Sequence, residues 1–479
     1  MIYGNFIAGE WQLPGASGTF PVHNPATGAV VAEVASATAD DVRRAIDGAE
    51  AVQPAWAAMP AIERSAIIRR AAAIMVDRID ELASLLVQEQ GKPLAQAKGE
   101  IMYGVGFLDW FAEEGRRAYG MTIPASVSEK RIIIAKQPIG ITVAITPWNF
   151  PSVQLLRKLG AALGAGCSMI AKPAELTPLS ALEIGRAFEE AGLPKGVLSV
   201  VCAPEPYEFT DVIMADPRVR AISFTGSTEV GKILMRASAD TMKKVSLELG
   251  GQAPTIVFED ADLDAVVVET MASKFRNMGQ TCVSVNRIYV HASIADELGA
   301  RLQAAMSALT VGDGLHELTT VGPLVEPAAI EKVERHVADA ISKGAKVLVG
   351  GSRSSGLGTD QFFEPTLLID VDETMQVMQE ETFGPVAPLS VFTDEDDVVA
   401  RANATPFGLS AYIFTRDLNR AIRVSEALEF GTVGINDSTF SAVQAPFGGY
   451  KESGLGREGG NMGLEEFMET KFISIGHIR

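Results

Sequence analysis

Apolar residues recur at helical spacing in the region from Asp40 to Gln90. Positions three and four residues apart share one face of a helix, and arginines and acidic residues occupy the other face. The apolar positions are Ile67, Ile68, Ala71, Ile74, Met75, Ile79, Leu82, Leu85 and Leu86. The pattern predicts an amphipathic helical region that ends at Gly91-Lys-Pro93, because glycine and proline stop a helix. A further amphipathic helix is expected from about residue 94 to 119.

Short apolar segments alternate with helical segments between residues 139 and 259. Continuous apolar runs are typical of strands buried on both faces, so the alternation predicts a parallel sheet with helices on both sides. Ligands of such sheets bind at the carboxyl ends of the strands. The predicted strands are 141–146, 168–172, 197–201, 221–225 and 255–258, and the predicted helices lie near 152–164, 178–191, 207–215 and 228–238.

A second alternating series, from about 260 to 436, predicts another α/β domain. Its glycine-rich segment 350–358 lacks the strand–loop–helix arrangement of a phosphate-binding loop and is expected to be a surface loop. The helices are expected near 262–275, 293–308, 326–343 and 418–429, and the strands at 287–291, 346–349, 386–392 and 411–414.

Three peripheral segments also have strand character. Residues 1–36 contain short β-prone runs between turns, and residues 471–475 are expected to form a final strand. Residues 131–136 form a β-branched run with polar flanks. This pattern predicts an edge strand, which could pair with a second subunit.

Composition limits the partners and the setting of the protein. Its 479 residues suit about two or three domains. The formal net charge of −19 argues against nucleic acid or an anionic membrane surface, because no basic excess exists to neutralise phosphates. No apolar run reaches the ~18–20 residues of a membrane helix, and no signal-peptide pattern is present. We therefore expect a cytoplasmic protein.

Cysteine and histidine are scarce, and their positions are scattered. No CxxC or Cys/His cluster occurs, so we expect neither a disulfide framework nor a metal site. Cys167 and Cys202 lie in apolar, strand-like surroundings and are expected to be structural. Cys282 differs, because it follows the small polar run Asn277-Met-Gly-Gln-Thr281 and has Arg276 six residues upstream. It is the candidate nucleophile of the chain.

Seven motifs, in order along the chain, together resemble the aldehyde dehydrogenase superfamily. The resemblance covers essentially the whole length. The motifs are Thr146-Pro-Trp-Asn-Phe-Pro151, Lys172-Pro-Ala-Glu175, Phe224-Thr-Gly-Ser-Thr-Glu-Val-Gly231, Glu248-Leu-Gly-Gly251, Gly279-Gln-Thr-Cys282, Glu381-Thr-Phe-Gly-Pro385 and Pro446-Phe-Gly-Gly449.

The resemblance implies an α/β protein with a parallel, Rossmann-like cofactor domain, an α/β catalytic domain and a small β element for oligomerisation. It also implies a homodimer or homotetramer. We expect residues 1–121 and 142–250 to form the NAD-binding domain and 251–436 the catalytic domain. Residues 122–141 and 461–479 are the expected oligomerisation strands, and 437–460 the segment that returns to the cofactor domain and the substrate pocket.

Three residues resemble the catalytic groups of the family. Cys282 matches the nucleophile, which attacks an aldehyde as a thiolate and therefore needs an electropositive or helix-terminal setting. Glu248 matches the general base, and a carboxylate in a partly apolar cleft has a raised pKa that suits proton transfer near neutrality. Asn149 matches the donor that stabilises the oxyanion together with the backbone N–H of Cys282.

The resemblance also assigns the cofactor site. Thr225-Gly226-Ser227 ends a predicted strand and opens a helix, where backbone N–H groups can bind a pyrophosphate. Gly231 is expected to allow close helix packing. A carboxylate at Glu175 accepts hydrogen bonds from a 2′-hydroxyl and repels a 2′-phosphate, which favours NAD over NADP. The cofactor residues are Thr146, Pro147, Trp148, Lys172, Glu175, Thr225, Gly226, Ser227, Gly231, Leu249, Glu381 and Phe383.

Arg157, Arg276 and Ser441 resemble the carboxylate-binding residues of the succinate-semialdehyde dehydrogenase subgroup. Two guanidinium groups and a hydroxyl suit a carboxylate. The loop around Ser441 departs from that subgroup, because it carries Phe440 and Gln444. Glutarate semialdehyde, 2-oxoglutarate semialdehyde and an aromatic aldehyde therefore remain alternative substrates.

Two other functions are compatible with the motifs. A coenzyme A-acylating semialdehyde dehydrogenase would share the nucleophile but would not need the water-activating Glu248. A non-catalytic NAD-binding protein could retain the fold, although such proteins usually lose the nucleophile or the base. The presence of Cys282, Glu248 and Asn149 favours the hydrolytic, NAD-dependent reaction.

Overall fold

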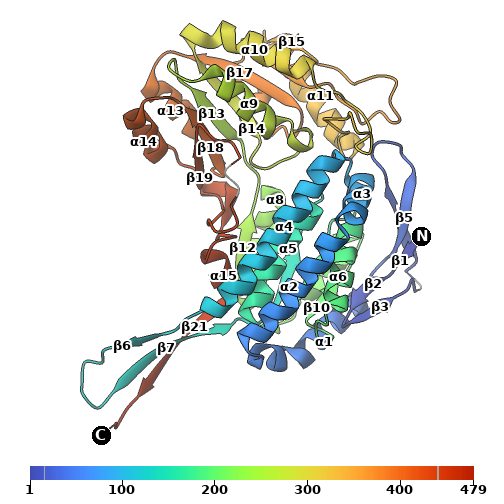
Figure 1. Cartoon of the computed structure of the whole chain (residues 1–479), viewed down its shortest axis with the longest axis vertical. Helices are drawn as coiled ribbons and strands as arrows, with labels where there is room; N and C mark the ends of the chain where they lie inside the picture. Colours follow the sequence, from blue (N-terminus) through green and yellow to red (C-terminus); the bar gives the residue numbers. More distant parts are fainter. Residues whose placement is uncertain (16, 440–441, 479) are drawn as a thin grey trace.

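The computed structural model contains two large sheets, each with helices packed on it, and a small sheet that projects from the body (Figure 1). The structure describes residues 1–15, 17–439 and 442–478. None of the helices in this described part has the length and apolarity that a bilayer crossing needs.

The first large sheet has eight strands in the order β20-β12-β11-β8-β9-β10-β2-β3. The strands from β12 to β10 run parallel, and antiparallel strands flank them on both sides. The strands are β2 (Asn5–Ile7), β3 (Glu10–Gln12), β8 (Ile141–Ile145), β9 (Ser168–Lys172), β10 (Leu198–Val200), β11 (Val219–Thr225), β12 (Lys244–Glu248) and β20 (Gly454–Leu455).

Eight helices accompany this sheet, and a core that includes Trp56, Phe107 and Phe188 lies beneath them. The helices are α1 (Ala39–Ala58), α2 (Ala61–Asp77), α3 (Ile79–Gln90), α4 (Leu94–Glu114), α5 (Pro151–Ala165), α6 (Leu179–Glu190), α7 (Pro206–Ala215) and α8 (Thr228–Ser238).

The region predicted as one helical run from 40 to 90 is three helices. The chain leaves helical geometry at Met59, and Pro60 precedes α2 because it can start a helix but cannot donate within one. Arg78 separates α2 from α3 with a non-helical backbone. The predicted stop at Gly91 is confirmed, since Gly91 adopts the left-handed conformation after α3.

The second large sheet has the order β15-β16-β17-β14-β13-β18-β19, and only β15 is antiparallel to its neighbour. Its strands are β13 (Ala253–Val257), β14 (Val285–His291), β15 (Lys346–Val349), β16 (Thr366–Ile369), β17 (Val386–Phe392), β18 (Ser410–Phe414) and β19 (Thr432–Ile435). Its helices are α9 (Leu263–Lys274), α10 (Ala295–Ser307), α11 (Pro327–Ser342), α12 (Gln376–Gln379), α13 (Glu395–Asn403) and α14 (Leu418–Ala427).

One strand prediction was assigned to the wrong sheet. The segment predicted at 255–258 forms β13 of the second sheet, and the first sheet instead contains β12, which the apolar pattern missed because polar residues alternate along it. Strands β16 and β19 and helix α13 were also missed. The chain crosses between the sheets at residues 249–252, so Glu248 ends a strand of one sheet just before the other begins.

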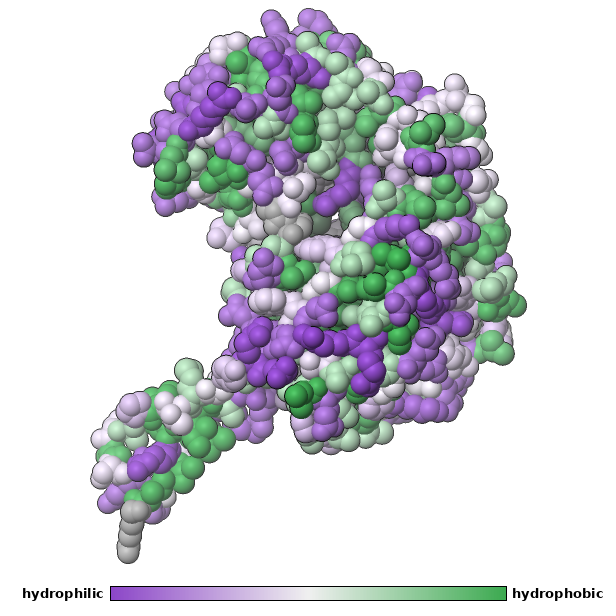
Figure 2. All heavy atoms as spheres, viewed as in Figure 1, coloured by the Kyte–Doolittle hydropathy of each residue, from purple (hydrophilic) through white to green (hydrophobic). Residues whose placement is uncertain are grey.

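The small sheet contains β6 (Met121–Ile123), β7 (Arg131–Pro138) and β21 (Met468–Ile475) in the order β21-β7-β6. The prediction that residues 131–136 form an edge strand is wrong, because β7 pairs with both neighbours. The sheet extends away from the body, and Figure 2 shows apolar residues along it. Most of β21 is exposed, including Phe472 at 62%.

Short elements complete the described chain. Strands β1 (Ile2–Tyr3), β4 (Thr19–His23) and β5 (Val30–Ala35) form a three-stranded sheet near the N-terminus, which confirms the short strands predicted there. The helix α15 (Met462–Glu465) precedes β21 and contacts α5.

Candidate active site

A cavity of about 590 Å³ lies between the carboxyl ends of the first sheet and the loop that carries Cys282. Residues at the ends of β8, β9 and β11 line one side, and Cys282, Glu381 and Phe383 line the other. Every predicted cofactor residue except Gly231 lines this cavity, as do Asn149 and Cys282. The structure thus brings together residues from distant parts of the chain at the strand ends where a parallel sheet binds ligands.

The segment after β11 has the features of a dinucleotide phosphate site. Ser227 is the N-cap of α8, and its hydroxyl accepts a hydrogen bond from the N–H of Val230 at 3.3 Å. A Cβ atom added to Gly231 would lie only 2.5 Å from Leu249 Cδ2, so glycine is required for the close packing of α8 against the next segment. An exposed helix N-terminus with a glycine-containing turn suits a pyrophosphate.

A lysine and a carboxylate stand at the end of β9. Lys172 Nζ lies 2.5 Å from Glu175 Oε1, and the Glu175 side chain is 37% exposed within the lined cavity. The carboxylate can therefore reach a ribose hydroxyl while it keeps its ion pair. These residues fit the ribose of a nicotinamide dinucleotide.

Glu381 and Phe383 lie on the opposite side of the cavity. Glu381 Oε1 accepts a hydrogen bond from the N–H of Gly251 at 2.9 Å, and burial raises the pKa of Glu381 to about 7. The ring of Phe383 meets that of Trp148 edge-on, with 5.5 Å between centroids. Phe383 has a φ of +54°, a conformation that costs energy for a residue with a side chain.

The loop before Cys282 is strained. Asn277, Met278 and Gly279 have φ values of +50°, +57° and +74°, so two residues with side chains adopt the left-handed conformation in succession. Close packing also holds the nucleophile in place, since a Cβ atom on Gly251 would lie 2.4 Å from the Cys282 carbonyl oxygen. Strain of this kind persists where surrounding contacts fix it.

The surroundings of Cys282 disfavour the thiolate. Burial raises the pKa of the thiol to about 12, and the nearby Glu381 and Glu248 act in the same direction. Arg157 and Arg276 lower the pKa but do not outweigh burial. The electropositive setting expected from the sequence is therefore insufficient in the free protein, and attack by this thiol requires a base. Cys167 and Cys202 are buried, as expected.

Glu248 ends β12 and is 2% exposed. Burial, followed by repulsion from Glu458, raises its pKa well above the usual value, while Arg157 and Lys158 oppose the shift. Neither carboxyl oxygen has a hydrogen-bond partner among the residues that the structure describes. A raised pKa is the direction predicted from the sequence, and an unpartnered buried carboxyl is available for proton transfer.

Asn149 lies just before α5 and contacts the nucleophile loop. One N–H of its amide donates to the Gln280 carbonyl oxygen at 2.9 Å. Its own backbone carbonyl accepts hydrogen bonds from Lys92 Nζ at 2.7 Å and from Asn277 Nδ2 at 2.9 Å. The side chain is thus fixed beside the Cys282 loop and lines the same cavity as Cys282.

The two predicted substrate arginines do not line the cavity. Arg157 is buried in α5, where its Nε lies 2.5 Å from Glu458 Oε2 and its guanidinium lies 5.0 Å from the Phe447 ring centroid. Arg276 is partly exposed, with its guanidinium 5.6 Å from the Phe150 ring centroid. Its Nε has no hydrogen-bond partner in the described chain. Ser441 lies outside the described residues.

The sequence interpretation missed two buried ion pairs behind the site. Lys158 contacts Glu458 and donates to Thr225 Oγ1 at 2.7 Å, and Lys92 Nζ lies 2.5 Å from Glu100 Oε2. A signal for the first pair was present, since Lys158 follows Arg157 within an otherwise apolar run. The described residues contain no group of histidine, cysteine and acidic side chains suited to a metal ion.

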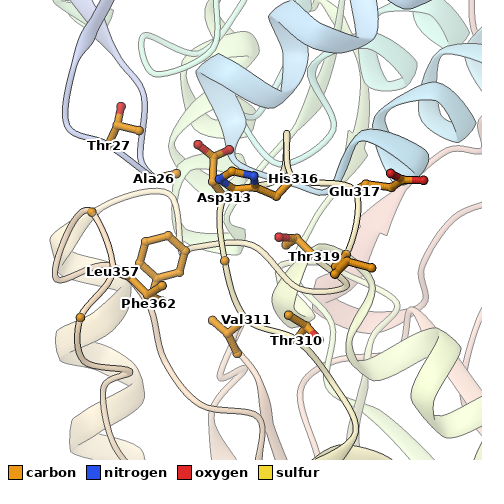
Figure 3. Close-up of a pocket in the computed structure, with 14 residues that line it drawn as sticks. Ala26, Thr27, Thr310, Val311, Asp313, His316, Glu317, Thr319, Leu357 and Phe362 are labelled. Carbon is orange, nitrogen blue, oxygen red and sulfur yellow. The ribbon is translucent and has the colours of Figure 1, made fainter.

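A second cavity of about 590 Å³ lies away from this site and is shown in Figure 3. Loop residues such as Asp313, His316 and Phe362 line it together with Ala26 and Thr27. The loop at 350–358, predicted to lie at the surface, contributes Gly356, Leu357 and Gly358 to its wall. Neither the predicted catalytic residues nor the predicted cofactor residues take part in it.

A dinucleotide-type cavity that contains a cysteine, an amide donor and an adjacent buried carboxyl defines an oxidoreductase with a candidate thiol nucleophile. The sequence profile of the aldehyde dehydrogenase family matches residues 11–473, and the chain belongs to this family. The resemblance and the α/β fold class predicted from the motifs are thereby confirmed. Members of this family use NAD or NADP.

Particular relatives are similar over nearly the full length. The chain is 52% identical to the glutarate-semialdehyde dehydrogenase of Pseudomonas putida, covering 98% of this chain and 97% of the relative. It is also 52% identical, with the same coverage, to the succinate-semialdehyde dehydrogenase of Escherichia coli whose name specifies NADP(+). The crystal structure of succinate-semialdehyde dehydrogenase from Burkholderia pseudomallei is 50% identical and superposes with a TM-score of 0.97, covering 99% of this chain and 98% of that one.

Proposed function

We propose that this aldehyde dehydrogenase oxidises a semialdehyde with a second acidic group, such as succinate semialdehyde, to the dicarboxylate, with NAD as the hydride acceptor. The observation that carries the proposal is the single cavity in which Cys282 and Asn149 face dinucleotide-binding residues, with Glu248 buried at the end of the adjoining strand. The names of two relatives at 52% identity, which specify the semialdehydes of glutarate and succinate, support the substrate class.

The proposed reaction begins with a proton transfer. Because burial keeps the Cys282 thiol protonated, Glu248 accepts its proton, directly or through a water molecule. The sulfur then forms a bond to the aldehyde carbon, and the carbonyl oxygen becomes an alkoxide. The second N–H of Asn149 and the backbone N–H of Cys282 stabilise this oxyanion.

A bound NAD would supply the acceptor for the hydride of the substrate carbon. Lys172, Glu175, Ser227 and Glu381 are the residues that would hold it. Glu248 first releases the Cys282 proton to solvent. The remaining thioester is then hydrolysed when Glu248 takes a proton from water and the resulting hydroxide attacks the thioester carbon. The bond between carbon and sulfur breaks, and the Cys282 thiolate leaves and regains a proton. The carboxylate product then leaves, and no acyl group has to be passed to coenzyme A.

NAD is proposed over NADP because Glu175 stands where the adenosine ribose would bind. Its carboxylate repels a 2′-phosphate, and its ion pair with Lys172 occupies the positive charge that could otherwise attract that phosphate. The Escherichia coli relative is named for NADP(+), so the preference is a property of this chain to be measured. Steady-state kcat/KM with each dinucleotide tests it, and equal or higher values with NADP would reject it.

Arg276 is proposed as the main ligand of the substrate carboxylate, with Arg157 and Ser441 contributing. Arg276 is partly exposed, and its Nε has no hydrogen-bond partner among the described residues, whereas Arg157 already neutralises Glu458. The length of the preferred semialdehyde is tested by a kcat/KM panel with succinate, glutarate and 2-oxoglutarate semialdehydes and an aromatic aldehyde. A preference for the aromatic or an uncharged aldehyde would reject the acid-binding pocket.

Oligomerisation through the projecting sheet is part of the same proposal. Strand β21 is largely exposed and lies at one edge of its sheet, where a strand presents unpaired N–H and C=O groups. A second copy of the chain can satisfy these groups, which favours a homodimer or homotetramer. Analytical ultracentrifugation measures the state, and a monomer at micromolar concentration would reject the proposal.

A further inference from the structure

Lys92 and Glu100 form an ion pair with fully buried side chains behind the active site. The exposed fraction of both side chains is 0%, and Lys92 Nζ lies 2.5 Å from Glu100 Oε2. Lys92 lies in the connection between α3 and α4, and Glu100 lies on α4. Removing two charges from water costs free energy that their mutual attraction often fails to recover. The contribution of this pair to stability is therefore not enough to explain its presence.

The pair holds the backbone on both sides of Asn149. Lys92 Nζ donates to the Asn149 carbonyl oxygen at 2.7 Å and lies 3.8 Å from the ring centroid of Phe150. Glu100 Oε1 accepts hydrogen bonds from the N–H groups of Ser152 at 2.9 Å and Val153 at 3.3 Å, in the first turn of α5. The N-cap Phe150 supplies no side-chain cap to this helix, so Glu100 from α4 acts in its place.

The nucleophile loop is tied to the same point. Asn277 Nδ2 donates to the Asn149 carbonyl oxygen at 2.9 Å, so Asn277 and Lys92 share one acceptor. Asn277 is itself held by Gln90, whose Nε2 donates to Asn277 Oδ1 at 2.8 Å, and by Gln96, whose Oε1 accepts from the Asn277 N–H at 2.8 Å. The α3–α4 junction therefore contacts both the oxyanion donor and the strained loop that leads to Cys282.

We propose that Lys92 and Glu100 are a positioning pair that fixes Asn149 relative to Cys282, so that its amide meets the oxyanion as it forms. The proposal rests on the role given to Asn149 in the proposed function. Loss of the pair leaves Asn277 as the remaining donor to the Asn149 carbonyl, so the amide moves but is not removed. Small displacements of a catalytic group lower the rate without removing substrate binding.

The test is a double variant, Lys92→Met with Glu100→Gln, in the full-length enzyme. It removes both charges together, so no unpaired charge is left buried, and the glutamine oxygen still accepts from the first turn of α5. The matched control is Arg78→Met with Glu183→Gln, which removes a partly buried pair of 2.8 Å that links the α2–α3 junction to α6. Active sites are counted by iodoacetamide labelling of Cys282, and kcat is expressed per labelled site.

We expect the double variant to lower kcat about 10-fold while both KM values stay within about 3-fold, since misplacement acts on the transition state. In an Asn149→Ala background the same change is expected to lower kcat less than about 2-fold, because the group that the pair positions is already absent. The control pair is expected to lower the melting temperature without changing kcat per labelled site.

An equal fold loss in the two backgrounds, or a loss explained by fewer labelled sites, would overturn the positioning role while leaving the proposed function intact. If Asn149→Ala itself keeps the wild-type kcat, the oxyanion role of Asn149 fails and the positioning role fails with it. Glu100→Gln alone is carried through the same cycle, so that poor folding of the double variant does not remove the test. Burial lowers the pKa of Lys92, so its amine can lose its proton when the carboxylate is replaced and still donate to the Asn149 carbonyl oxygen. Its loss of kcat is expected to vanish in the Asn149→Ala background in the same way.

Discussion

Replacing Glu248 by glutamine tests the role of this residue in catalysis separately from its effect on protein stability. The substitution keeps the size of the side chain and removes the proton acceptor. Because neither carboxyl oxygen has a hydrogen-bond partner in the described chain, no native hydrogen bond is lost. General acid–base catalysis typically raises the reaction rate about 100-fold to 10,000-fold. This increase corresponds to a decrease of about 2.7–5.4 kcal/mol in the activation free energy. We expect kcat, followed by NADH absorbance, to fall within that range.

The same variant is expected to be as stable as the wild type or more so at neutral pH. The pKa of Glu248 is raised in the folded protein. Between the usual pKa and the raised one, a fraction of the folded molecules therefore holds a proton that the unfolded chain has released, while the ionised fraction acts as the base. This difference lowers the stability of the wild type as pH rises, at about 1.4 kcal/mol per unit of pKa difference. Glutamine does not titrate, so the variant lacks this penalty. Its melting temperature, measured by calorimetry, should not fall.

Glu89→Gln provides the matched control. Burial raises the pKa of Glu89 to about 7, but its carboxylate accepts hydrogen bonds from the N–H groups of Leu179 at 2.8 Å and Ser180 at 2.9 Å. Weakening these bonds costs about 1–3 kcal/mol of stability, and kcat is expected to be unchanged. If Glu248→Gln retained wild-type kcat, or if both variants lost activity equally, the assignment of Glu248 as the base would be refuted.

Three further predictions concern specificity and assembly. Arg276→Ala is expected to raise KM for succinate semialdehyde about 10-fold to 100-fold, which is the effect of losing one hydrogen bond to a charged group. KM for propanal should stay within about 2-fold. Equal effects on both aldehydes in steady-state kinetics would exclude a carboxylate pocket. Glu175→Gln removes the charge that repels a 2′-phosphate, so the ratio of kcat/KM with NADP to that with NAD should rise, and a lower ratio would exclude this role. Phe472→Glu places a charge on exposed β21 and should reduce the mass measured by analytical ultracentrifugation. The control Leu418→Glu, at a site 72% exposed on α14, should not change the mass. An unchanged mass in both variants would show that β21 is not part of the interface between subunits.

Helices and strands with a regular apolar pattern were predicted from the sequence. The elements that were missed or misplaced have physical causes. Continuous apolar runs identified β8, β9 and β11, whereas β12 was missed because Lys244 and Ser246 interrupt its apolar pattern. Residues 255–258 were assigned to the wrong sheet, since periodicity shows that a segment is buried but not which sheet it joins. The β7 strand was mistaken for an edge because its partner β21 lies more than 300 residues later in the chain.

Site residues that belong to sequence motifs could be predicted from the sequence. Properties of the site that depend on contacts between distant segments could not. Most of the predicted cofactor residues line one cavity together with Asn149 and Cys282, whereas Gly231 and Glu248 are not among its lining residues. The raised pKa of the Cys282 thiol was not foreseen, because it depends on how the folded protein surrounds a side chain that remains partly exposed at the cavity. Nor could the partners of Lys92 or Glu458 be inferred, since Lys92 meets the Asn149 carbonyl oxygen and Glu458 meets its lysine only after segments distant in the sequence have packed together.

The central claim is that Cys282 forms a covalent bond with the aldehyde carbon. The most direct measurement is mass spectrometry of the enzyme quenched in acid during turnover of succinate semialdehyde with NAD, compared with Cys282→Ala. The account predicts an acyl adduct on the peptide that contains Cys282, and neither adduct nor NADH formation in the variant. NADH formation at the wild-type rate by Cys282→Ala, or an adduct on Cys167 or Cys202 instead, would contradict it.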